Sequence, residues 1–415
     1  MTDWSEELTY LLKKTGKAAG SAVRAVQSAI DDDYNEVICY RGFAGPTRMW
    51  VYGRVIEKRE IGASTDGDST LRNLLNTYRR ADSDPVAMAE VEVSCGSAHV
   101  TMKADDEGFF GGWIDADAPA TSDEWTKYTA RVVSPVIADA APVQADGEAL
   151  LISPKTKFGV ISDIDDTVIQ SRVSNFIQAA RTVMLGNART RLPFPGVAAF
   201  YRALRDGAAG DEKNPIFYVS SSPWNIFDVI SEFMDLQHIP KGPLLLRDWD
   251  INLGALSSSR HFEHKEKFIR DMLDLYPALP FILIGDSSQK DPEIYRQIVK
   301  EFPNRILAIY IRDVTRSAER ASSIKLLADE IVAAKSTLVL AEHTLDAAKH
   351  AAGQGWISEK NLPEIGEEKR ADEGTAGNKA PAPQGGQPTS AAPPTVVDGS
   401  SNGAGLHQTG PLPPA

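Results

Sequence analysis

Paired carboxylates directly behind a short apolar run most restrict what this chain can fold into. Residues 159–167 read Gly-Val-Ile-Ser-Asp-Ile-Asp-Asp-Thr, and the apolar run that ends at Ser162 has no helical period, which predicts a buried strand. Because side chains alternate along an extended chain, Asp163, Asp165 and Thr167 begin on one side of the strand end. Two carboxylates this close repel each other, so they need a cation or a shared proton. A polar turn capping the strand is the alternative, and the Asp-x-Asp-x-Thr order disfavours it.

Two further predicted strands also end in polar side chains. Residues 216–219 form an apolar run that leads into three serines, and residues 281–284 form another that leads into Gly-Asp. In open α/β sheets, ligands gather beyond the carboxyl ends of the strands. The sequence therefore predicts an α/β fold with a parallel sheet and one crevice at its edge. Besides the first two aspartates, the crevice is expected to collect Ser220, Ser221, Lys265, Asp286 and Asp291.

Each of these residues has an ordinary structural interpretation when it is taken alone. The serines before Pro223 are typical of a helix N-cap, and a single Lys265 is more often a solvated helix residue. Asp291 before a proline is a common turn signal. His261 and His264 lack the partners of a zinc site and are only minor candidates for substrate contact. The functional interpretation therefore depends on the whole set in its order.

That order resembles the haloacid dehalogenase superfamily of phosphotransferases. The motifs that carry the resemblance are Asp163-Ile-Asp-Asp-Thr167, Ser220, Lys265 and Gly285-Asp286 with Asp291. Two longer stretches, 218–224 and 283–295, look like the fungal actin-patch phosphatidate phosphatase family and its bacterial relatives, and lipins share the Asp-x-Asp-x-Thr variant. The resemblance covers about residues 150–315. It implies a haloacid dehalogenase-like Rossmannoid parallel sheet with a small helical flap.

The resemblance also implies roles for the carboxylates. A phosphomonoester repels an anionic nucleophile, and Mg²⁺ offsets that charge while preferring oxygen ligands. Asp163 would be both metal ligand and nucleophile, forming an aspartyl-phosphate. Asp165 would be general acid and then base, with its backbone carbonyl as a metal ligand. Asp286 would be the second carboxylate ligand, and Asp291 a ligand or an outer partner.

The remaining motif residues would bind phosphate. Thr167, Ser220 and Ser221 would hold phosphate oxygens together with nearby backbone amides. Lys265 would neutralise the phosphate and the nucleophilic carboxylate together.

These roles predict a Mg²⁺-dependent phosphomonoesterase. The resemblance implies that its substrate is phosphatidate, a phospholipid at a membrane surface, with diacylglycerol and phosphate as products. A phosphatase for a soluble phosphomonoester is one alternative. A non-catalytic module that binds a phospholipid head group is another, and the presence of both Asp163 and Asp165 counts against it, since binding needs neither nucleophile nor acid. A scaffold that recruits protein partners is a third.

Composition excludes several classes of protein. The formal net charge is −13, from 57 acidic and 44 basic residues, which argues against a nucleic-acid surface and against purely electrostatic adhesion to anionic lipid. The only cysteines, Cys39 and Cys95, imply no disulfide framework. No stretch of about 18 apolar residues predicts a transmembrane segment, and the acidic N-terminus does not resemble a secretory signal. We therefore expect a cytoplasmic protein, with peripheral membrane attachment as an option.

Changes in composition divide the chain into five predicted parts. Residues 1–33 predict an amphipathic helix, and residues 34–150 a small β-sandwich. Residues 151–315 predict the catalytic domain, and residues 316–357 a C-terminal helix. Residues 358–415 are poor in aromatic and apolar residues, which predicts a disordered tail.

A short hydrophobic insertion follows the first motif. Residues 170–195 are too few for a large cap domain and predict a small helical flap. Its larger apolar side chains face either a lipid substrate or the protein core, and these two interpretations are nearly balanced. They are Phe176, Ile177, Val183, Met184 and Leu185.

Overall fold

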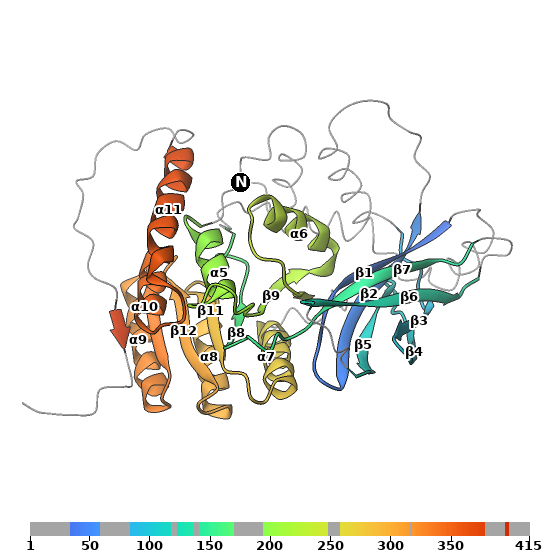
Figure 1. Cartoon of the computed structure of the whole chain (residues 1–415), viewed down its shortest axis with the longest axis horizontal. Helices are drawn as coiled ribbons and strands as arrows, with labels where there is room; N and C mark the ends of the chain where they lie inside the picture. The colour runs from blue at the N-terminus through green and yellow to red at the C-terminus, as the bar shows by residue number, and fades with distance from the viewer. Residues whose placement is uncertain are drawn as a thin grey trace, which may run out of the picture.

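The computed structural model describes residues 34–58, 84–117, 123–136, 141–169, 194–247, 258–315, 317–377 and 395–397. Within these residues, two seven-stranded sheets lie next to each other, and helices cover the second one (Figure 1). The predicted N-terminal helix over 1–33 lies outside the described residues, as does nearly all of the flap over 170–195.

The first sheet is built from the β-forming residues between 34 and 150. Its strands are β1 (Tyr34–Ala44), β2 (Arg48–Lys58), β3 (Glu90–Cys95), β4 (Ala98–Lys103), β5 (Phe109–Asp115), β6 (Trp125–Ser134) and β7 (Gln144–Leu150). Their order in space is β4-β3-β6-β7-β1-β2-β5, and the outermost strands β4 and β5 contact each other. The strands thus form one curled sheet, in place of the two stacked sheets that the predicted sandwich requires.

Alternation along β2 shows why this sheet has two buried faces. Val51 and Val55 are fully buried inside the curl. Trp50 and Tyr52, at the intervening positions, join the core of the second sheet instead. The period of two residues therefore directs one set of side chains inward and the other toward the neighbouring sheet.

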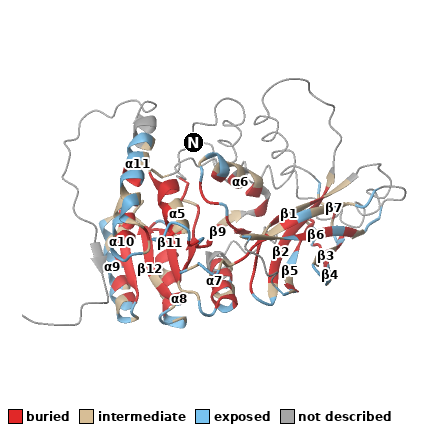
Figure 2. Ribbon diagram, in the orientation of Figure 1, coloured by how far each residue is buried: buried red, intermediate tan, exposed pale blue. Residues whose placement is uncertain are grey.

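The second sheet is parallel except at one edge. Its strands are β8 (Gly159–Ser162), β9 (Ile216–Pro223), β10 (Leu244–Arg247), β11 (Phe281–Asp286), β12 (Ile306–Arg312), β13 (Thr337–Ala341) and β14 (Thr395–Val397). Their order is β10-β9-β8-β11-β12-β13-β14, with β14 antiparallel to β13. Every residue of β8 and β11 is buried, as expected for strands that helices cover on both faces (Figure 2). The predicted α/β character of this region is confirmed.

Helices pack on the second sheet in two groups. The helices are α5 (Val197–Asp206), α6 (Phe227–Leu236), α7 (Ser258–Leu275), α8 (Asp291–Glu301), α9 (Ala318–Ala333), α10 (Thr344–Gly353) and α11 (Leu362–Gly377), with short 3₁₀ turns η1 (Trp224–Ile226) and η2 (Glu359–Asn361). Helices α7, α8 and α9 contact one another in sequence, and α5, α10 and α11 form the other group. The sheet order reverses between β8 and β11, and in such sheets this is where ligands bind.

The predicted single helix over 316–357 is wrong. The segment contains α9, then the buried strand β13, then α10. Lys335 adopts a left-handed conformation with φ of 61° just after α9, and the β-forming run 337–341 follows it. Alanine-rich flanks obscured this short strand in the sequence pattern, because alanine fits a helix well.

The predicted disorder from residue 358 is also wrong for its first part. Residues 359–377 form η2 and α11, and α11 packs against α5 and α10. Ile365 is fully buried in that contact. Carboxylates of α11 accept hydrogen bonds from the first turn of α5, with Ala199 N 2.9 Å from Glu368 Oε1 and Gly196 N 3.0 Å from Asp372 Oδ2. These acids stabilise the positive end of α5.

Aromatic rings join the two sheets into one core. The Trp224 ring in η1 stacks on Tyr52 at a centroid distance of 4.3 Å and on Tyr40 at 4.9 Å. Phe227 lies 4.3 Å from Tyr40 as well. Trp224 is only 2% exposed. The first sheet therefore packs directly against the turn that follows β9.

Candidate active site

Two aspartates meet where the strand order of the second sheet reverses. Asp163 directly follows β8, and Asp286 is the last residue of β11. The two strands pair in parallel, with Ser162 opposite Ile284, and the Asp163 amide donates to the Ile284 carbonyl over 2.9 Å. The backbone register of the sheet therefore brings the two side chains together.

A third aspartate and a lysine complete a buried cluster. One carboxylate oxygen from each of Asp163, Asp286 and Asp291 lies within 4.8 Å of the others. Lys265, on α7, donates to Asp163 Oδ1 over 2.8 Å and to Asp291 Oδ1 over 2.5 Å. All four side chains are buried. One lysine thus faces three carboxylates, which leaves an excess of negative charge.

Two carboxylate oxygens of this cluster are buried and accept no hydrogen bond from any described residue: Asp163 Oδ2 and Asp286 Oδ2. Asp286 Oδ1 is fixed by the backbone amides of Ser288 at 2.6 Å and Gln289 at 3.0 Å. Both oxygens of Asp291 are engaged, one by Lys265 and the other by the Asp286 amide at 3.2 Å. Unpartnered buried oxygens are costly, and oxygen donors of this kind suit a hard divalent cation such as Mg²⁺.

Burial controls the charge of the cluster. It raises the pKa of Asp163 well above its ordinary value, although Lys265 opposes the change. Burial, with Asp291 second, raises the pKa of Asp286 to about 6. Burial by itself lowers the pKa of Lys265, but Asp163 and Asp291 reverse this and raise it overall. The lysine is therefore cationic at neutral pH, and a cation beside the aspartates would favour their ionised forms.

Asp165 lies apart from this cluster. Its Oδ2 accepts hydrogen bonds from Ser220 Oγ at 2.7 Å and Ser222 Oγ at 3.0 Å. Its backbone carbonyl, expected to face a metal, accepts a hydrogen bond from Gln289 Nε2 at 3.2 Å and keeps a second lone pair. The turn that separates the two aspartates needs a left-handed residue, and Asp166 adopts φ of 57° there. Asparagine and aspartate tolerate this conformation better than most residues.

The structure distributes the predicted phosphate-binding residues unevenly. Thr167 is buried, and its hydroxyl has no hydrogen-bond partner among the residues that the structure describes. Ser220 holds Asp165, whereas Ser221 does not join that contact. Ser222, which the sequence interpretation did not select, does. Strand alternation was the available signal, because residues two apart on β9 point the same way.

The region that carries this site is similar in sequence to known proteins. Residues 158–313 match the family model described as phosphatidate phosphatase APP1, catalytic domain. The chain is 32% identical over 193 residues to phosphatidate phosphatase APP1 of Saccharomyces cerevisiae, covering 46% of this chain and 32% of the yeast protein. It is 29% identical over 157 residues to an uncharacterized protein of Schizosaccharomyces pombe, covering 37% of this chain and 25% of that one.

The chain thus spans about a third or less of the length of these relatives. Among solved structures, a carbohydrate acetylesterase from Xanthomonas citri aligns over 70% of this chain and 72% of its own, at 12% identity and a TM-score of 0.21, a likeness too weak to bear on fold or function. The family match contains all of the site residues and confirms the resemblance predicted from the motifs. Residues 158–313 therefore match the catalytic-domain model of the actin-patch phosphatidate phosphatase family, which supports the resemblance.

Proposed function

We propose that the chain is a Mg²⁺-dependent phosphatase that hydrolyses phosphatidate to diacylglycerol and phosphate. The observation that carries the proposal is the buried cluster of Asp163, Asp286 and Asp291 around Lys265, with two carboxylate oxygens left unpartnered. The choice of phosphatidate follows from the name of the yeast relative. We assign the parallel sheet, with its nucleophile after β8, to the haloacid dehalogenase type.

The same residues fit a divalent cation. Asp163 Oδ2 and Asp286 Oδ2 would be the direct carboxylate ligands, and Asp291 would support them through Lys265 and the Asp286 amide. Bound Mg²⁺ would supply positive charge that offsets the phosphate oxygens. This arrangement makes Asp291 an outer partner rather than a ligand.

The chain's own groups divide the reaction into two steps. In the first, a carboxylate oxygen of Asp163 forms a bond to phosphorus while the bond to the leaving alkoxide breaks, and Asp165 gives that alkoxide a proton. In the second, Asp165 takes a proton from water, which attacks phosphorus and releases phosphate and the Asp163 carboxylate. Lys265 orients Asp163 and balances its charge throughout.

Ser220 and Ser222 support the acid–base role of Asp165. Both hydroxyls donate to the same oxygen, Oδ2, which leaves Oδ1 of Asp165 to face the reacting group. A carboxylate fixed from one side keeps its orientation between the two steps, and orientation is a large part of what a positioned catalytic group contributes.

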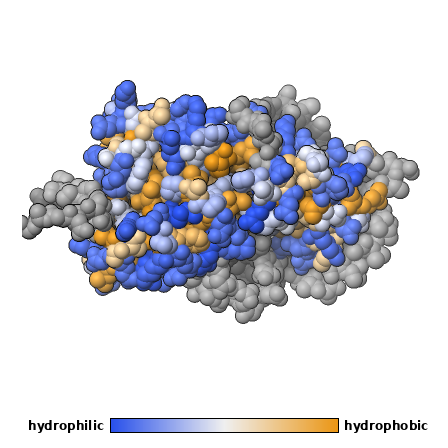
Figure 3. Space-filling view, turned by 60° about the horizontal axis from the view of Figure 1, so that its bottom comes forward, coloured by the Kyte–Doolittle hydropathy of each residue, from blue (hydrophilic) through white to orange (hydrophobic). Residues whose placement is uncertain are grey.

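A soluble phosphomonoester is the second candidate substrate. In the part of the chain that the structure describes, no helix is long and apolar enough to cross a membrane. Hydrophobic residues on the face in Figure 3 are interspersed with hydrophilic ones. The exposed large hydrophobic side chains among the described residues come from four separate places: Met88, Val136, Leu236 and Leu326. The apolar residues of the predicted flap, expected to face either lipid or the protein core, lie outside the described residues. Contact of a cytoplasmic protein with a membrane surface is therefore part of the proposal.

Phosphate release separates these functions. Full-length protein should release phosphate from short-chain phosphatidate in Mg²⁺ and not in chelator, and more slowly from glycerol 3-phosphate. Asp163→Asn should abolish the release, whereas Asp274→Asn, a matched change at an exposed position of α7, should not. Equal rates with both substrates would favour the soluble substrate. Turnover that survives Asp163→Asn would contradict the proposal.

A further inference from the structure

The loop between β11 and α8, residues 287–290, positions two aspartates of the site. The backbone amides of Ser288 and Gln289 donate to Oδ1 of Asp286 over 2.6 Å and 3.0 Å. The Gln289 side chain also donates to the Asp165 carbonyl over 3.2 Å. The geometry of both aspartates therefore depends on whatever keeps this short loop in its conformation.

One arginine holds the loop by its backbone carbonyls. Arg320 lies in the first turn of α9, and its Nε donates to the Ser287 carbonyl over 2.8 Å. Its Nη2 donates to the Gln289 carbonyl over 2.7 Å. The Ser287 carbonyl and the Ser288 amide belong to one planar peptide group, so Arg320 and Asp286 hold the same plane from opposite edges. Because the guanidinium is a rigid planar fork, it also fixes the two carbonyls relative to each other.

Glu293 fixes the guanidinium in turn. Its carboxylate oxygens accept from Nη1 of Arg320 over 2.5 Å and from Nη2 over 3.0 Å, which joins the first turns of α8 and α9. The two side chains are 21% and 29% exposed, and an ion pair that water reaches contributes little to stability. A cation in the first turn of a helix also opposes the helix dipole. Helix stability therefore does not explain Arg320, whereas its contacts with the loop do.

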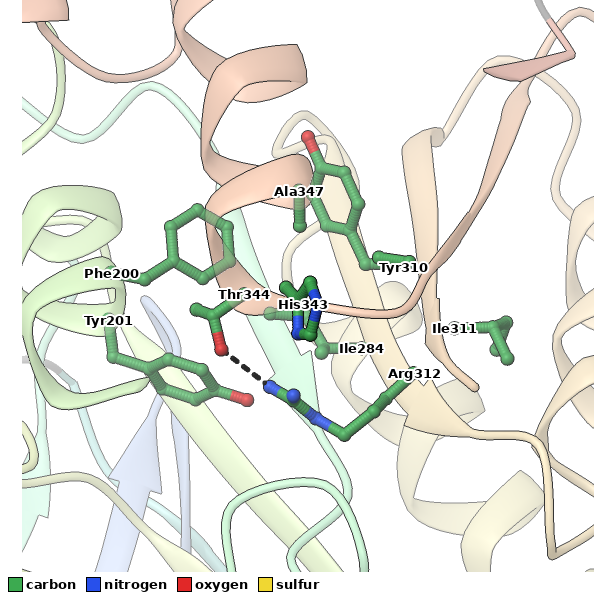
Figure 4. Close-up of a pocket in the computed structure, with 10 residues that line it drawn as sticks. Phe200, Tyr201, Ile284, Tyr310, Ile311, Arg312, His343, Thr344 and Ala347 are labelled. Carbon is green, nitrogen blue, oxygen red and sulfur yellow. Dashed lines mark hydrogen bonds between the residues drawn. The ribbon is translucent and has the colours of Figure 1, made fainter. Parts of the chain in front are cut away.

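Arg312 is also close to Asp286, but its hydrogen bond goes elsewhere. The two residues lie opposite each other in the pairing of β11 with β12. Burial lowers the pKa of Arg312 to about 10, and Tyr201 and Asp286 oppose that change. Its Nη2 donates to Thr344 Oγ1 at the start of α10 over 2.8 Å (Figure 4). Arg312 therefore balances the charge of Asp286 from the neighbouring strand, and Arg320 holds the loop.

The support for the loop comes from the segment that follows β12. Ser287 Oγ donates to Asp313 Oδ1 over 3.1 Å and accepts from the Val314 amide over 3.0 Å. Arg320 adds its two carbonyl contacts a few residues further on. Arg320 lies beyond residues 158–313, the part of the chain that matches the family model. The motifs that identify the aspartates therefore do not include the residue that holds their loop.

We propose that Arg320 is a positioning residue for the metal site. By holding the carbonyls of the loop, it keeps the loop amides on Asp286 Oδ1, which leaves Oδ2 free for a cation. Arg320 can have this role only if Asp286 holds a divalent cation, so the proposal rests on the proposed function. Removing an outer partner of a metal ligand typically weakens metal affinity about 10–100-fold. The loss of Arg320 should therefore appear as a loss of Mg²⁺ affinity.

Calorimetric titration of the full chain with Mg²⁺, in the absence of substrate, measures this effect directly. The wild type should bind Mg²⁺, and Asp286→Asn should lose that binding, which assigns the measured heat to the aspartate site. Arg320→Met removes every side-chain donor at similar length and should weaken the affinity at least about tenfold. Arg320→Lys keeps the charge but lacks the planar fork, so its affinity should fall between those of the wild type and Arg320→Met.

Two further variants separate positioning of the loop from packing of the helices. Arg296→Met removes the contact of Arg296 with Glu330, which joins the same two helices and not the loop. Its Mg²⁺ affinity should equal that of the wild type. Glu293→Gln weakens the ion pair and keeps both carbonyl contacts of Arg320, so its affinity should fall less than that of Arg320→Met. Thermal unfolding in chelator checks that each variant is folded.

The outcomes distinguish a failure of this role from a failure of the proposed function. If the wild type binds Mg²⁺ and Arg320→Met binds it equally tightly, Arg320 has no such role and the proposed function stands. A loss in Arg296→Met or Glu293→Gln as large as in Arg320→Met would assign the effect to helix packing and overturn the role. Absence of binding by the wild type, or binding that survives Asp286→Asn, would overturn both. If Arg320→Met fails to fold, Arg320→Lys decides: wild-type affinity overturns the role, and weaker affinity supports it.

Discussion

Asp286→Asn should stabilise the metal-free protein. Burial and the neighbouring Asp291 raise the pKa of Asp286 from an ordinary 3.8 to about 6. One pKa unit corresponds to about 1.4 kcal/mol, so the ionised carboxylate costs metal-free protein up to about 3 kcal/mol at neutral pH. Asparagine keeps the oxygen that accepts from the amides of Ser288 and Gln289, and it removes the charge. We expect a gain in the free energy of unfolding of about 1–3 kcal/mol.

The sign of this effect fixes its pH dependence. A carboxylate whose folded pKa is raised binds its proton more tightly in the folded state. The cost is therefore fully present above pH 6 and disappears as pH falls toward 4. The difference between Asp286→Asn and the wild type should be largest above pH 6 and shrink below it.

Asp291→Asn is the matched comparison and should have the opposite sign. Asp291 accepts from Lys265 and from the Asp286 amide, so removing its charge weakens a buried ion pair and should destabilise the protein by about 1–3 kcal/mol. Urea unfolding in chelator, at pH 5 and pH 7.5, measures both variants. If Asp286→Asn destabilises the metal-free protein as much as Asp291→Asn does, the two free oxygens are not a strained cation site and the reasoning fails.

Three further outcomes follow from the same contacts. Asp163→Asn should lower turnover of short-chain phosphatidate by at least about 10²–10⁴-fold while circular dichroism stays unchanged; near-normal turnover would exclude it as nucleophile. Chelator should remove activity and Mg²⁺ restore it, with Ca²⁺ a poor substitute because its coordination is larger and looser; activity that persists in chelator would exclude the metal. Glu368→Ala should cost about 1–2 kcal/mol in urea unfolding, because it removes the acceptor for Ala199 N, whereas Glu364→Ala, at a position 60% exposed, should cost under about 0.5. Equal losses would mean that the cap on α5 contributes nothing.

The sequence predicted the parallel sheet and the meeting of its aspartates because both depend on local pattern. A short apolar run followed by aspartate predicts a buried strand with an acidic end, whatever surrounds it in the fold. Because the carboxyl ends of parallel strands meet at one edge of the sheet, this pattern also places Asp163 and Asp286 together without any knowledge of side-chain contacts. Lys265 followed from its place in the motif order. The structure adds which oxygens are free, and that depends on amides such as those of Ser288 and Gln289, which no pattern identifies.

The prediction failed where a segment depends on distant partners. Strand β13 is short, and its pairing with β12 and β14 makes it a strand rather than part of a helix. Helix α11 has a composition typical of disorder, but Ile365 and Glu368 find partners on α5 more than 150 residues earlier. Helix propensity and composition describe the average of such a segment, whereas a few specific long-range contacts decide whether it is ordered.

The aromatic stack of Trp224 on Tyr40 and Tyr52 makes the cooperative folding unit larger than the domain that sequence comparison defines. Residues 158–313 are the unit that the family comparison identifies. The unit that unfolds cooperatively is expected to be larger, because the aromatic rings of β1 and β2 belong to the same continuous core as the sheet that carries the aspartates. Each stacked pair adds about 0.5–1.5 kcal/mol beyond the area it buries. Loosening the first sheet therefore removes packing from the turn that directly follows Ser220 and Ser222 on β9. A destabilising substitution in β2 would then disturb Asp165, which these serines hold, and so alter acid–base catalysis as well as the amount of folded protein.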